Sequence, residues 1–388
     1  MLYITLLDQF HPGIYSSQVI DVCDHLNKKY RANIRLVAFL SIRELLKTDA
    51  RKKIIQLSPS AIILPAFPGL RFFELTSVFL FLFCLFTGER KVICRNVFCT
   101  WMALKVKKWG MIKTVVFDGR SAMAAEISEY DVFPVDYLRK NVKLFEYHAV
   151  NDSDFRMSVS NELINYWNDN YNYSGINHIV IPCTLDEKYF AKNKFEFNKE
   201  ALKIRENFGF KDDDIVLVYA GSTAPWQSFD LLEGMLTPLL QNDKRIKVLF
   251  LSKKNKENTQ FQLKFPDNIF IKWVEHKDVL TYLKCCDYGI LLRDKSDTNK
   301  VASPTKFAEY LYSGLPVLIS ENLGDFSSYV VKNSCGFVLK ENIKDWSFLK
   351  KVNLPKKEHC FELACSNFMK ESDNNENSYQ KLNNFLLK

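Results

Sequence analysis

The sequence is poor in the residues that mark fibrous or unstructured chains. Glycine and proline supply only 13 and 12 of 388 residues, and 25% of the chain is charged, which excludes collagen-like, low-complexity and wholly disordered classes. Apolar residues make up 47% of the chain, enough for substantial cores. At about 150 residues per domain, the length predicts two or three globular domains.

Patterns typical of disulfides and metals are also missing. No Cys-x-x-Cys pair occurs among the ten cysteines. Most of them lie in apolar runs, as Cys84 does in FLFCLF, so we predict buried reduced thiols. The six histidines do not recur at ligand spacing, and no second pair accompanies His359 and Cys360. The sequence therefore predicts no structural metal.

The N-terminal segment MLYITLLDQFHPG lacks the basic start, the long apolar stretch and the cleavage site of a secretory signal. It is more typical of a buried strand, so we expect a cytoplasmic protein. Lysine and arginine outnumber aspartate and glutamate by 53 to 45, a net charge of +8. This excess suits anionic small molecules, an anionic membrane surface or nucleic acid, and does not choose among them.

The most apolar segment, Leu75–Phe86, has the sequence LTSVFLFLFCLF. It is too short to cross a bilayer, since a spanning helix needs roughly 20 residues. Two interpretations are open. The segment is either a helix buried in an α/β core, or an exposed apolar surface that contacts the inner face of the cell membrane. The second interpretation would involve the nearby side chains of Lys105, Lys107, Lys108 and Trp109.

Short apolar or β-branched segments alternate with longer amphipathic segments along most of the chain. This alternation is typical of βα units on a parallel sheet. It pauses over a polar, charged stretch after residue 182 and restarts at residue 215, which predicts an α/β protein with two doubly wound, Rossmann-like domains. The predicted strands are residues 3–7, 34–40, 61–65, 91–94, 113–118, 155–160, 178–182, 215–221, 246–252, 269–274, 288–292 and 316–320.

Domain boundaries follow from these changes in composition. We assign residues 1–185 to the first Rossmann-like domain, 186–205 to a linker and 206–357 to the second domain. Residues 358–388 form C-terminal helices, interrupted by a polar segment at 371–377, that we expect to pack back on the first domain. The two domains would face a central cleft, because open α/β sheets bind ligands at their carboxyl edges.

A helix over residues 304–313 has well-marked ends. Ser303 is a suitable N-cap and Pro304 a suitable first residue, while Gly314 is the residue type expected just after the last turn. Lys306 does not fit this pattern. A cation in the first turn is disfavoured by the positive partial charge of the helix N-terminus.

A phosphate bound at this N-terminus would reverse the sign of that interaction. The first-turn amides, the hydroxyls of Ser303 and Thr305 and the Lys306 ammonium group would then converge on the anion. The alternative is a surface ion pair between Lys306 and Glu309, three residues apart. We favour the phosphate site, because the glycine-proline stop and the apolar strand after it place this helix inside the fold.

The segment NKVASPTKFAEYLYSGLPVLIS, residues 299–320, resembles the donor-binding helix of GT-B glycosyltransferases of the family 4 type. The form SPTKFAEYL resembles a branch of bacterial capsule and O-antigen transferases. The family has two glutamates with seven residues between them, followed by Gly-x-Pro-Val. Glu309 matches the second glutamate, which implies contact with the ribose of a nucleotide sugar, and Val301 replaces the first.

The loop after the first strand of the second domain resembles the family's diphosphate loop. The family has Gly-Arg there and a lysine five residues after the arginine, whereas this chain has Gly221 and Ser222, with Gln227 at the lysine position. The resemblance then implies that Lys306 and Arg293 supply the positive charge. Taken alone, Gly221 is also compatible with an ordinary strand-to-helix turn.

Two segments of the first domain resemble the family more loosely. Gly13, in QFHPG, resembles a glycine loop where the backbone approaches the substrate closely. The segment VFDGR resembles an Asp-x-Arg segment, which implies that Arg120 faces the reacting sugar or the acceptor. The alternative is an interior salt bridge of Arg120 with Asp118 or with Glu126.

The resemblance implies a GT-B fold and a retaining hexosyltransferase that needs no metal or other cofactor. It would transfer a sugar from a nucleoside-diphosphate sugar to a glycan or a lipid-linked saccharide in bacterial surface polysaccharide synthesis. The helix N-terminus and a lysine can stabilise the leaving diphosphate without Mg²⁺. The implied catalytic residues are Lys306 and Arg120, and the implied donor-binding residues are Gly13, Gly221, Ser222, Arg293, Ser303, Thr305 and Glu309.

Two other functions remain open at the level of sequence. One is a nucleotide-sugar epimerase of the same fold, and the other is a non-catalytic nucleotide-sugar-binding partner of a membrane glycan-assembly complex. A nucleotide-dependent dehydrogenase is discounted, because no Gly-x-Gly-x-x-Gly follows a predicted strand. We expect no nucleic-acid partner.

Overall fold

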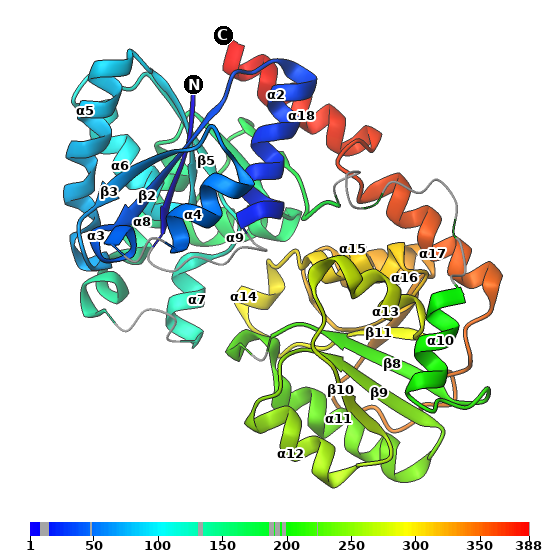
Figure 1. Cartoon of the computed structure of the whole chain (residues 1–388). Helices are drawn as coiled ribbons and strands as arrows, with labels where there is room; N and C mark the ends of the chain where they lie inside the picture. The colour runs from blue at the N-terminus through cyan, green and yellow to red at the C-terminus, as the bar shows by residue number, and fades with distance from the viewer. Residues whose placement is uncertain are drawn as a thin grey trace. The chain divides into compact units, whose positions relative to one another are not determined.

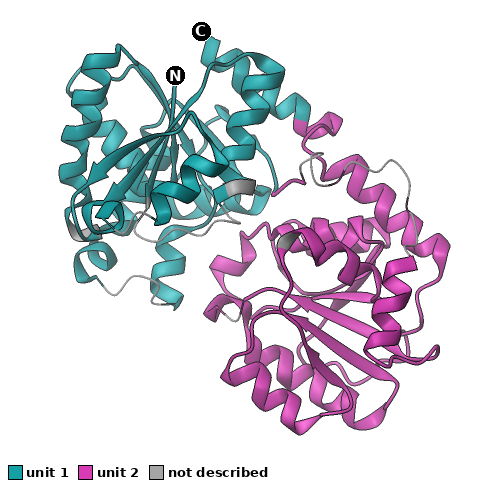
Figure 2. Ribbon diagram, viewed as in Figure 1, with its two compact units in different colours: residues 1–182, 376–388 teal, residues 183–375 magenta. Residues whose placement is uncertain are grey.

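The chain forms two compact units, each built on its own parallel β-sheet (Figure 1, Figure 2). Unit 1 comprises Met1–Pro182 and Glu376–Lys388, and unit 2 comprises Cys183–Asn375. Both chain termini therefore belong to unit 1. The structure is a computed structural model that describes residues 1–7, 15–46, 49–130, 135–185, 190, 195, 199–222 and 224–387.

Unit 1 contains a seven-stranded sheet in the order β3-β2-β1-β4-β5-β6-β7, with parallel pairing throughout. This is the Rossmann order with one added strand, and the direction of winding changes between β1 and β4. The strands are β1 (Leu2–Leu7), β2 (Arg35–Ser41), β3 (Ile62–Ala66), β4 (Lys91–Arg95), β5 (Thr114–Asp118), β6 (Phe155–Ser158) and β7 (His178–Val180).

Helices connect the strands of unit 1 and pack on the sheet (Figure 1). Covered on both faces, such a sheet requires nearly continuous apolar strands, and the sequences of β1 and β2, LYITLL and RLVAFLS, meet this requirement. The helical segments are η1 (Ser16–Ile20), α2 (Asp21–Tyr30), α3 (Ile42–Leu46), α4 (Asp49–Leu57), η2 (Leu70–Thr76), α5 (Ser77–Thr87), α6 (Asn96–Lys108), α7 (Met123–Tyr130), α8 (Asp136–Asn151) and α9 (Asn161–Tyr171).

Unit 2 repeats the plan with six strands in the order β10-β9-β8-β11-β12-β13, again all parallel. The change of winding direction falls between β8 and β11, the place where open α/β sheets bind ligands. The strands are β8 (Ile215–Ala220), β9 (Ile246–Leu251), β10 (Ile269–Ile271), β11 (Tyr288–Leu291), β12 (Val317–Ser320) and β13 (Gly336–Leu339).

The helices of unit 2 lie on both sides of this sheet (Figure 1). Two apolar clusters, one on each face, make up its core. The helical segments are α10 (Lys199–Asn207), η3 (Pro225–Gln227), α11 (Phe229–Asn242), α12 (Lys256–Lys264), η4 (His276–Asp278), α13 (Val279–Lys284), α14 (Asp297–Lys300), α15 (Thr305–Tyr312), α16 (Phe326–Asn333) and α17 (Leu354–Asn367).

The C-terminal helices are divided between the units. Helix α17 packs on α15 in unit 2. The last helix, α18 (Asp373–Leu387), crosses the boundary between the units, and its Tyr379 and Leu386 belong to the apolar core of unit 1. In that core, the rings of Phe385 and Phe155 lie 4.6 Å apart between centroids. The chain thus returns to its first unit through α18 alone.

All the predicted strands are present, and the predicted α/β fold with two Rossmann-like halves is confirmed. The edge strand β13 was not predicted. Residues 199–205, expected in the linker, are helical in α10, while 186–189, 191–194 and 196–198 lie outside the described residues. The predicted break at 371–377 is shorter than expected, because α18 begins at Asp373.

Two predictions about chemistry and membranes can be compared with the structure. No disulfide joins any of the ten cysteines, and all but Cys365 are buried, as predicted. Over the described part of the chain, no helix has both the length and the apolar character required to cross a membrane.

Candidate functional site

The carboxyl edge of the unit 2 sheet carries most of the predicted donor-binding residues. Gly221 and Ser222 follow β8, and Arg293 follows β11, so both segments lie where the winding direction changes. Arg293 is 8% exposed. Its backbone N–H donates to the Ser320 hydroxyl at 2.7 Å, and its Nη1 donates to Asn299 Oδ1 at 3.2 Å. The fold therefore fixes this guanidinium group at the edge of the sheet.

The loop after β8 is held by a buried tyrosine. The Tyr219 hydroxyl donates to the Ser222 carbonyl at 2.6 Å and lies 3.4 Å from Gln227 Oε1. Burial raises the pKa of Tyr219 to about 12, and the charge of Arg293 acts in the opposite direction. Ser222 and Gln227, which stand where the sequence resemblance has basic residues, are uncharged, so this loop carries no positive charge from those two positions. A Cβ added at Gly221 would lie 3.5 Å from the Tyr219 hydroxyl, an ordinary contact.

Helix α15 is attached to this edge by Tyr310. The buried Tyr310 hydroxyl accepts the Ala220 N–H at 2.9 Å and lies 3.3 Å from the Ile290 carbonyl, to which it can donate. Its ring lies against Gly289, where a Cβ would come within 2.4 Å of the ring carbons. One side chain therefore links α15 to both β8 and β11.

The predicted C-terminal end of α15 is confirmed, whereas its predicted N-cap is not. Gly314 adopts the left-handed φ of 75°, and the N–H groups of Gly314 and Leu315 donate to Leu311 and Tyr310, as the predicted C-terminal stop requires. The predicted N-cap is wrong. Pro304, whose side chain has no hydrogen-bond acceptor, holds the N-cap position, and the Ser303 hydroxyl accepts the Cys183 N–H at 2.9 Å.

The first turn of α15 contains the predicted lysine and glutamate. Lys306 Nζ lies 2.8 Å from Glu309 Oε2, with 30% of the lysine side chain and 6% of the glutamate side chain exposed. The ion pair considered as the alternative is therefore formed. It engages one of the three N–H donors of the ammonium group. Thr305 is the first residue of the same turn, so a partly exposed cation and a hydroxyl adjoin the helix N-terminus.

Val301 occupies the position of the missing first glutamate. It follows α14 and is fully buried. An apolar side chain in the core cannot hydrogen-bond a sugar. Of the two glutamates in the family pattern, the structure therefore has only the second, Glu309, as a polar side chain.

In unit 1, the carboxyl edge of the sheet is organised around a fully buried Asp118 at the end of β5. Arg120 Nε lies 2.7 Å from Asp118 Oδ1, so the interior salt bridge considered as the alternative is formed. Gly119 permits this turn, because a Cβ there would come within 2.6 Å of the Trp167 ring. The Arg120 side chain remains 12% exposed. Gly13, the other predicted residue of this edge, lies outside the described residues.

Two residues of this cluster were missed by sequence reasoning. Arg95 Nη1 lies 3.6 Å from Asp118 Oδ2, and the Tyr3 hydroxyl donates to the same carboxylate. Burial raises the pKa of Tyr3, with the Asp118 charge as the second cause. Arg95 ends β4 and Asp118 ends β5 as register partners. A charged residue directly after one predicted strand, Arg95, and one at the end of the next, Asp118, were therefore the available signal.

Glu146 anchors the helix that follows Arg120. Its carboxylate accepts the N–H groups of Met123 and Ala124 at 2.9 and 3.0 Å, at the start of α7, and the Tyr171 hydroxyl at 2.7 Å. Burial raises the pKa of Glu146 to about 7. Glu126, the other residue considered as a partner of Arg120, also has a pKa raised by burial.

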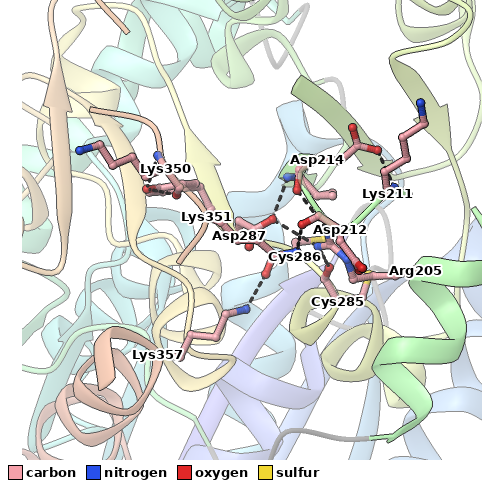
Figure 3. A network of polar contacts seen from close by, with 12 residues as sticks. Arg205, Lys211, Asp212, Asp214, Cys285, Cys286, Asp287, Lys350, Lys351 and Lys357 are labelled. Carbon is pink, nitrogen blue, oxygen red and sulfur yellow. Dashed lines mark hydrogen bonds and ion pairs between the residues drawn. The ribbon is translucent and has the colours of Figure 1, made fainter. Parts of the chain in front are cut away.

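A separate polar network lies at the opposite, amino-terminal edge of the unit 2 sheet (Figure 3). Asp287 accepts the Val216 N–H at 2.9 Å and lies 3.2 Å from Arg205 Nη1. Lys357 donates to the Cys286 carbonyl at 2.7 Å, and burial lowers its pKa. A cavity of about 220 Å³ adjoins these groups. Because the network joins α10, β8, β11 and α17, we assign it to packing.

The described residues contain no group of three or more His, Cys, Asp or Glu side chains placed to hold a metal ion. The side chains described above at the two carboxyl edges include arginine, lysine, tyrosine and serine beside carboxylates. Such an arrangement suits an anionic ligand better than a cation.

Solved structures with the same fold are numerous. HepE from Anabaena, solved in complex with UDP, matches with a TM-score of 0.71 and 12% identity over 99% of this chain and 100% of that chain. The glycosyltransferase WaaG of lipopolysaccharide biosynthesis matches at 0.67 and 13% over 100% and 99%. Sucrose-phosphate synthase from Thermosynechococcus elongatus matches at 0.69 and 13%, also over 100% and 99%.

These matches establish that the two Rossmann-like units form a fold of the GT-B glycosyltransferase type. At such identities the likeness concerns the fold. No protein-family model and no curated protein sequence matches the chain.

Proposed function

We propose that this chain is a retaining, metal-independent glycosyltransferase that takes a sugar from a nucleoside diphosphate. The observation that carries the proposal is the N-terminus of α15, with Thr305, Lys306 and Glu309, attached by Tyr310 to the switch point of a Rossmann sheet. A helix N-terminus beside a cation is a binding site for phosphate. The GT-B fold, and the UDP bound by HepE, support a nucleotide as the ligand.

On the donor side, the Lys306 ammonium group and the first-turn amides of α15 would stabilise the negative charge that develops on the leaving diphosphate. Glu309 would accept hydrogen bonds from the ribose. The Thr305 and Ser303 hydroxyls and the Gly221–Ser222 backbone would complete the phosphate contacts. Arg293 would add positive charge from the end of β11, where Asn299 and Ser320 hold it.

On the acceptor side, we assign Arg120 to the reacting sugar or the acceptor, and Gly13 to a close backbone approach. Asp118 orients Arg120 through the 2.7 Å contact. The acceptor we propose is a glycan or a lipid-linked saccharide of bacterial surface polysaccharide synthesis, within the family 4 type and its capsule and O-antigen branch. Lipopolysaccharide biosynthesis, the role stated for WaaG, supports this class of acceptor.

One observation favours a second function, a non-catalytic nucleotide-sugar-binding partner in glycan assembly. The position of the first family glutamate is the fully buried Val301. The two basic positions of the diphosphate loop are Ser222 and Gln227, both within reach of the Tyr219 hydroxyl. Such a protein would bind the nucleotide and lack turnover.

The test combines a binding assay with a turnover assay. Thermal unfolding is followed with UDP-, GDP-, ADP- and CDP-sugars, and a ligand of the folded state raises the midpoint. The donor that binds is then incubated with saccharide and lipid-linked saccharide acceptors. Transfer with retained anomeric configuration supports the proposal, and product formed without acceptor indicates an epimerase. Binding without turnover over the acceptor panel favours the second function, and no binding contradicts both.

A further inference from the structure

Helix α5 exposes an apolar face on the surface of unit 1. Its sequence, SVFLFLFCLFT, contains no charged residue. Ser77, Leu80 and Cys84 are buried, which defines the inner side of the helix. The α5 face comprises Phe72 and Leu75 on η2 and Val78, Leu82, Leu85 and Phe86 on α5, whose exposed fractions are 40%, 50%, 46%, 40%, 51% and 83% in that order.

These exposed side chains form one stripe. Leu75, Val78, Leu82 and Leu85 recur at intervals of three or four residues, and Phe86 follows Leu82 by four, the spacing that places side chains on the same side of a helix. In unit 2, by contrast, the large exposed apolar side chains among the described residues lie singly on separate elements, such as Leu263 on α12 and Val331 on α16. Single exposed apolar residues are ordinary, whereas a contiguous stripe marks an interaction surface.

A tryptophan extends the α5 face onto the end of α6. The rings of Phe81 and Trp109 meet edge to face, 5.7 Å apart between centroids, and Trp109 is 49% exposed. A tryptophan at the border of an apolar surface is typical of the interface between membrane and water.

The same border carries positive charge. Arg90 is exposed, and its Nη1 donates to the carbonyls of Gly110 and Met111, each at 3.0 Å. This contact holds Arg90 against the turn that follows Trp109. Lys108 and Lys113, on the two sides of that turn, are also exposed. We call Arg90, Lys108 and Lys113 the basic border.

Neighbouring carboxylates are engaged elsewhere. Glu74 is contacted by Lys105, Trp101 and Tyr137, and Glu89 by the N-terminal ammonium group and Arg35. Of the lysines suggested by the sequence, Lys105 thus pairs with Glu74. Lys107 pairs with Asp154 at 2.6 Å. Arg90, Lys108 and Lys113 of the basic border are exposed beside the apolar stripe, and they complement an anionic surface.

We propose that the α5 face and its basic border bind the surface of a bilayer that contains anionic phospholipids. α5 would lie in the plane of the interface, with Leu82, Leu85 and Phe86 among the acyl chains and the basic border among the headgroups. The carboxyl edge of the unit 1 sheet is a separate surface. The inference therefore does not depend on the proposed glycosyltransferase activity.

The experiment is co-sedimentation of the full chain with vesicles of phosphatidylcholine alone and with about 30% phosphatidylglycerol, a composition that supplies the negative surface potential. We expect binding to the anionic vesicles that weakens as salt is raised. The variant Leu85→Glu/Phe86→Glu should abolish it. The matched control Leu263→Glu/Val331→Glu, at exposed apolar positions of unit 2, should bind as the parent chain does.

The basic border is tested separately with Lys108→Ala/Lys113→Ala. Each cation near an anionic surface contributes about 1 kcal/mol, so the double variant should bind roughly 30-fold more weakly. Absence of binding to anionic vesicles, or unchanged binding by the Leu85/Phe86 variant, would overturn the proposal.

Self-association is the competing use of the α5 face. Light scattering after gel filtration that shows a dimer lost in the Leu85/Phe86 variant would assign the face to a second copy and overturn the membrane proposal. Nucleotide binding, measured by thermal shift on the same variants, should not change. Its absence in the parent chain would count against the proposed function alone.

Discussion

The carboxyl edges of the two sheets have the same strand order but differ in how their charged side chains are buried and paired. In unit 1, one fully buried carboxylate, Asp118, is contacted by two guanidinium groups and a tyrosine hydroxyl. In unit 2, a partly exposed ammonium group faces the Glu309 carboxylate, the buried Arg293 guanidinium bonds the Asn299 side chain, and neutral hydrogen bonds hold the loop after β8. The same topology therefore supports a charge cluster that is part of the core and an ion pair that a ligand can reach.

This difference separates stability from ligand binding. Removing one member of a buried ion cluster leaves charge without compensation in a medium that solvates it poorly, at a cost of about 3–5 kcal/mol. The Lys306–Glu309 pair has a buried carboxylate and a partly exposed ammonium group. An ion pair at i,i+3 contributes about 0.2–0.5 kcal/mol to an isolated helix. We expect substitutions in the unit 1 cluster to act mainly on folding, and substitutions of the Lys306–Glu309 pair to act mainly on the nucleotide.

The largest expected effect is that of Asp118→Ala. It should lower the free energy of unfolding of unit 1 by about 3–5 kcal/mol, because Arg95 and Arg120 lose their shared carboxylate. The measurement is urea unfolding followed by circular dichroism. Glu309→Ala is the comparison in unit 2 and should lower the free energy less, because the Lys306 ammonium group that it leaves behind is 30% exposed and remains hydrated. Similar losses in the two variants would remove the distinction between the edges.

Lys306→Ala should act on catalysis. We expect kcat to fall about 10²-fold with the fold intact, on the scale of losing one electrostatic stabiliser of a transition state. Turnover is measured with the donor identified by thermal shift, and circular dichroism checks the fold. Lys306→Arg, which keeps the charge, should recover part of the rate. Near-normal turnover in Lys306→Ala would refute the role of this lysine.

Glu309→Gln should act on affinity. We expect about tenfold weaker binding of the nucleotide, the scale of one hydrogen bond to a charged acceptor, with kcat less affected than in Lys306→Ala. Calorimetric titration with the nucleoside diphosphate measures it. Glu341→Gln, an exposed carboxyl group elsewhere in unit 2, should leave the affinity unchanged. Equal affinity in Glu309→Gln would exclude the ribose contact.

The fold was predictable because it depends on local patterns. Parallel strands covered on both faces need apolar runs, and such runs can be identified in the sequence. β13 was missed because its four residues, GFVL, form a half-exposed edge strand with too short a run. Gly314 was predicted correctly, since the left-handed φ at that position is a local requirement.

The site was predictable only where its contacts are local. Lys306 and Glu309 are three residues apart, and their ion pair was one of two alternatives. Ser303 was assigned to the wrong partner, because its hydroxyl bonds a backbone group 120 residues away. Tyr3 and Asp118 are 115 residues apart, and no local pattern joins them. Long-range hydrogen bonds decide the details that periodicity leaves open.

The last expected effect concerns pH and extends the comparison to a buried carboxyl group of unit 1. Burial raises the pKa of Glu146 from an ordinary value near 4.5 to about 7. A raised carboxyl pKa means that the folded state holds the proton more tightly. This contribution to stability is therefore complete below pH 4.5 and is lost as pH rises to about 7, with a slope of at most about 1.4 kcal/mol per pH unit.

Glu146→Gln has no proton to lose, so it should flatten the pH dependence of unfolding across this window. The amide still has one acceptor oxygen for the amides of Met123 and Ala124. Urea unfolding at several pH values measures the slope, and Glu341→Gln should retain that of the parent chain. If Glu146→Gln also keeps the parent slope, another group carries the pH dependence. In that case the hydrogen bonds of Glu146 to the start of α7 do not depend on pH over this range.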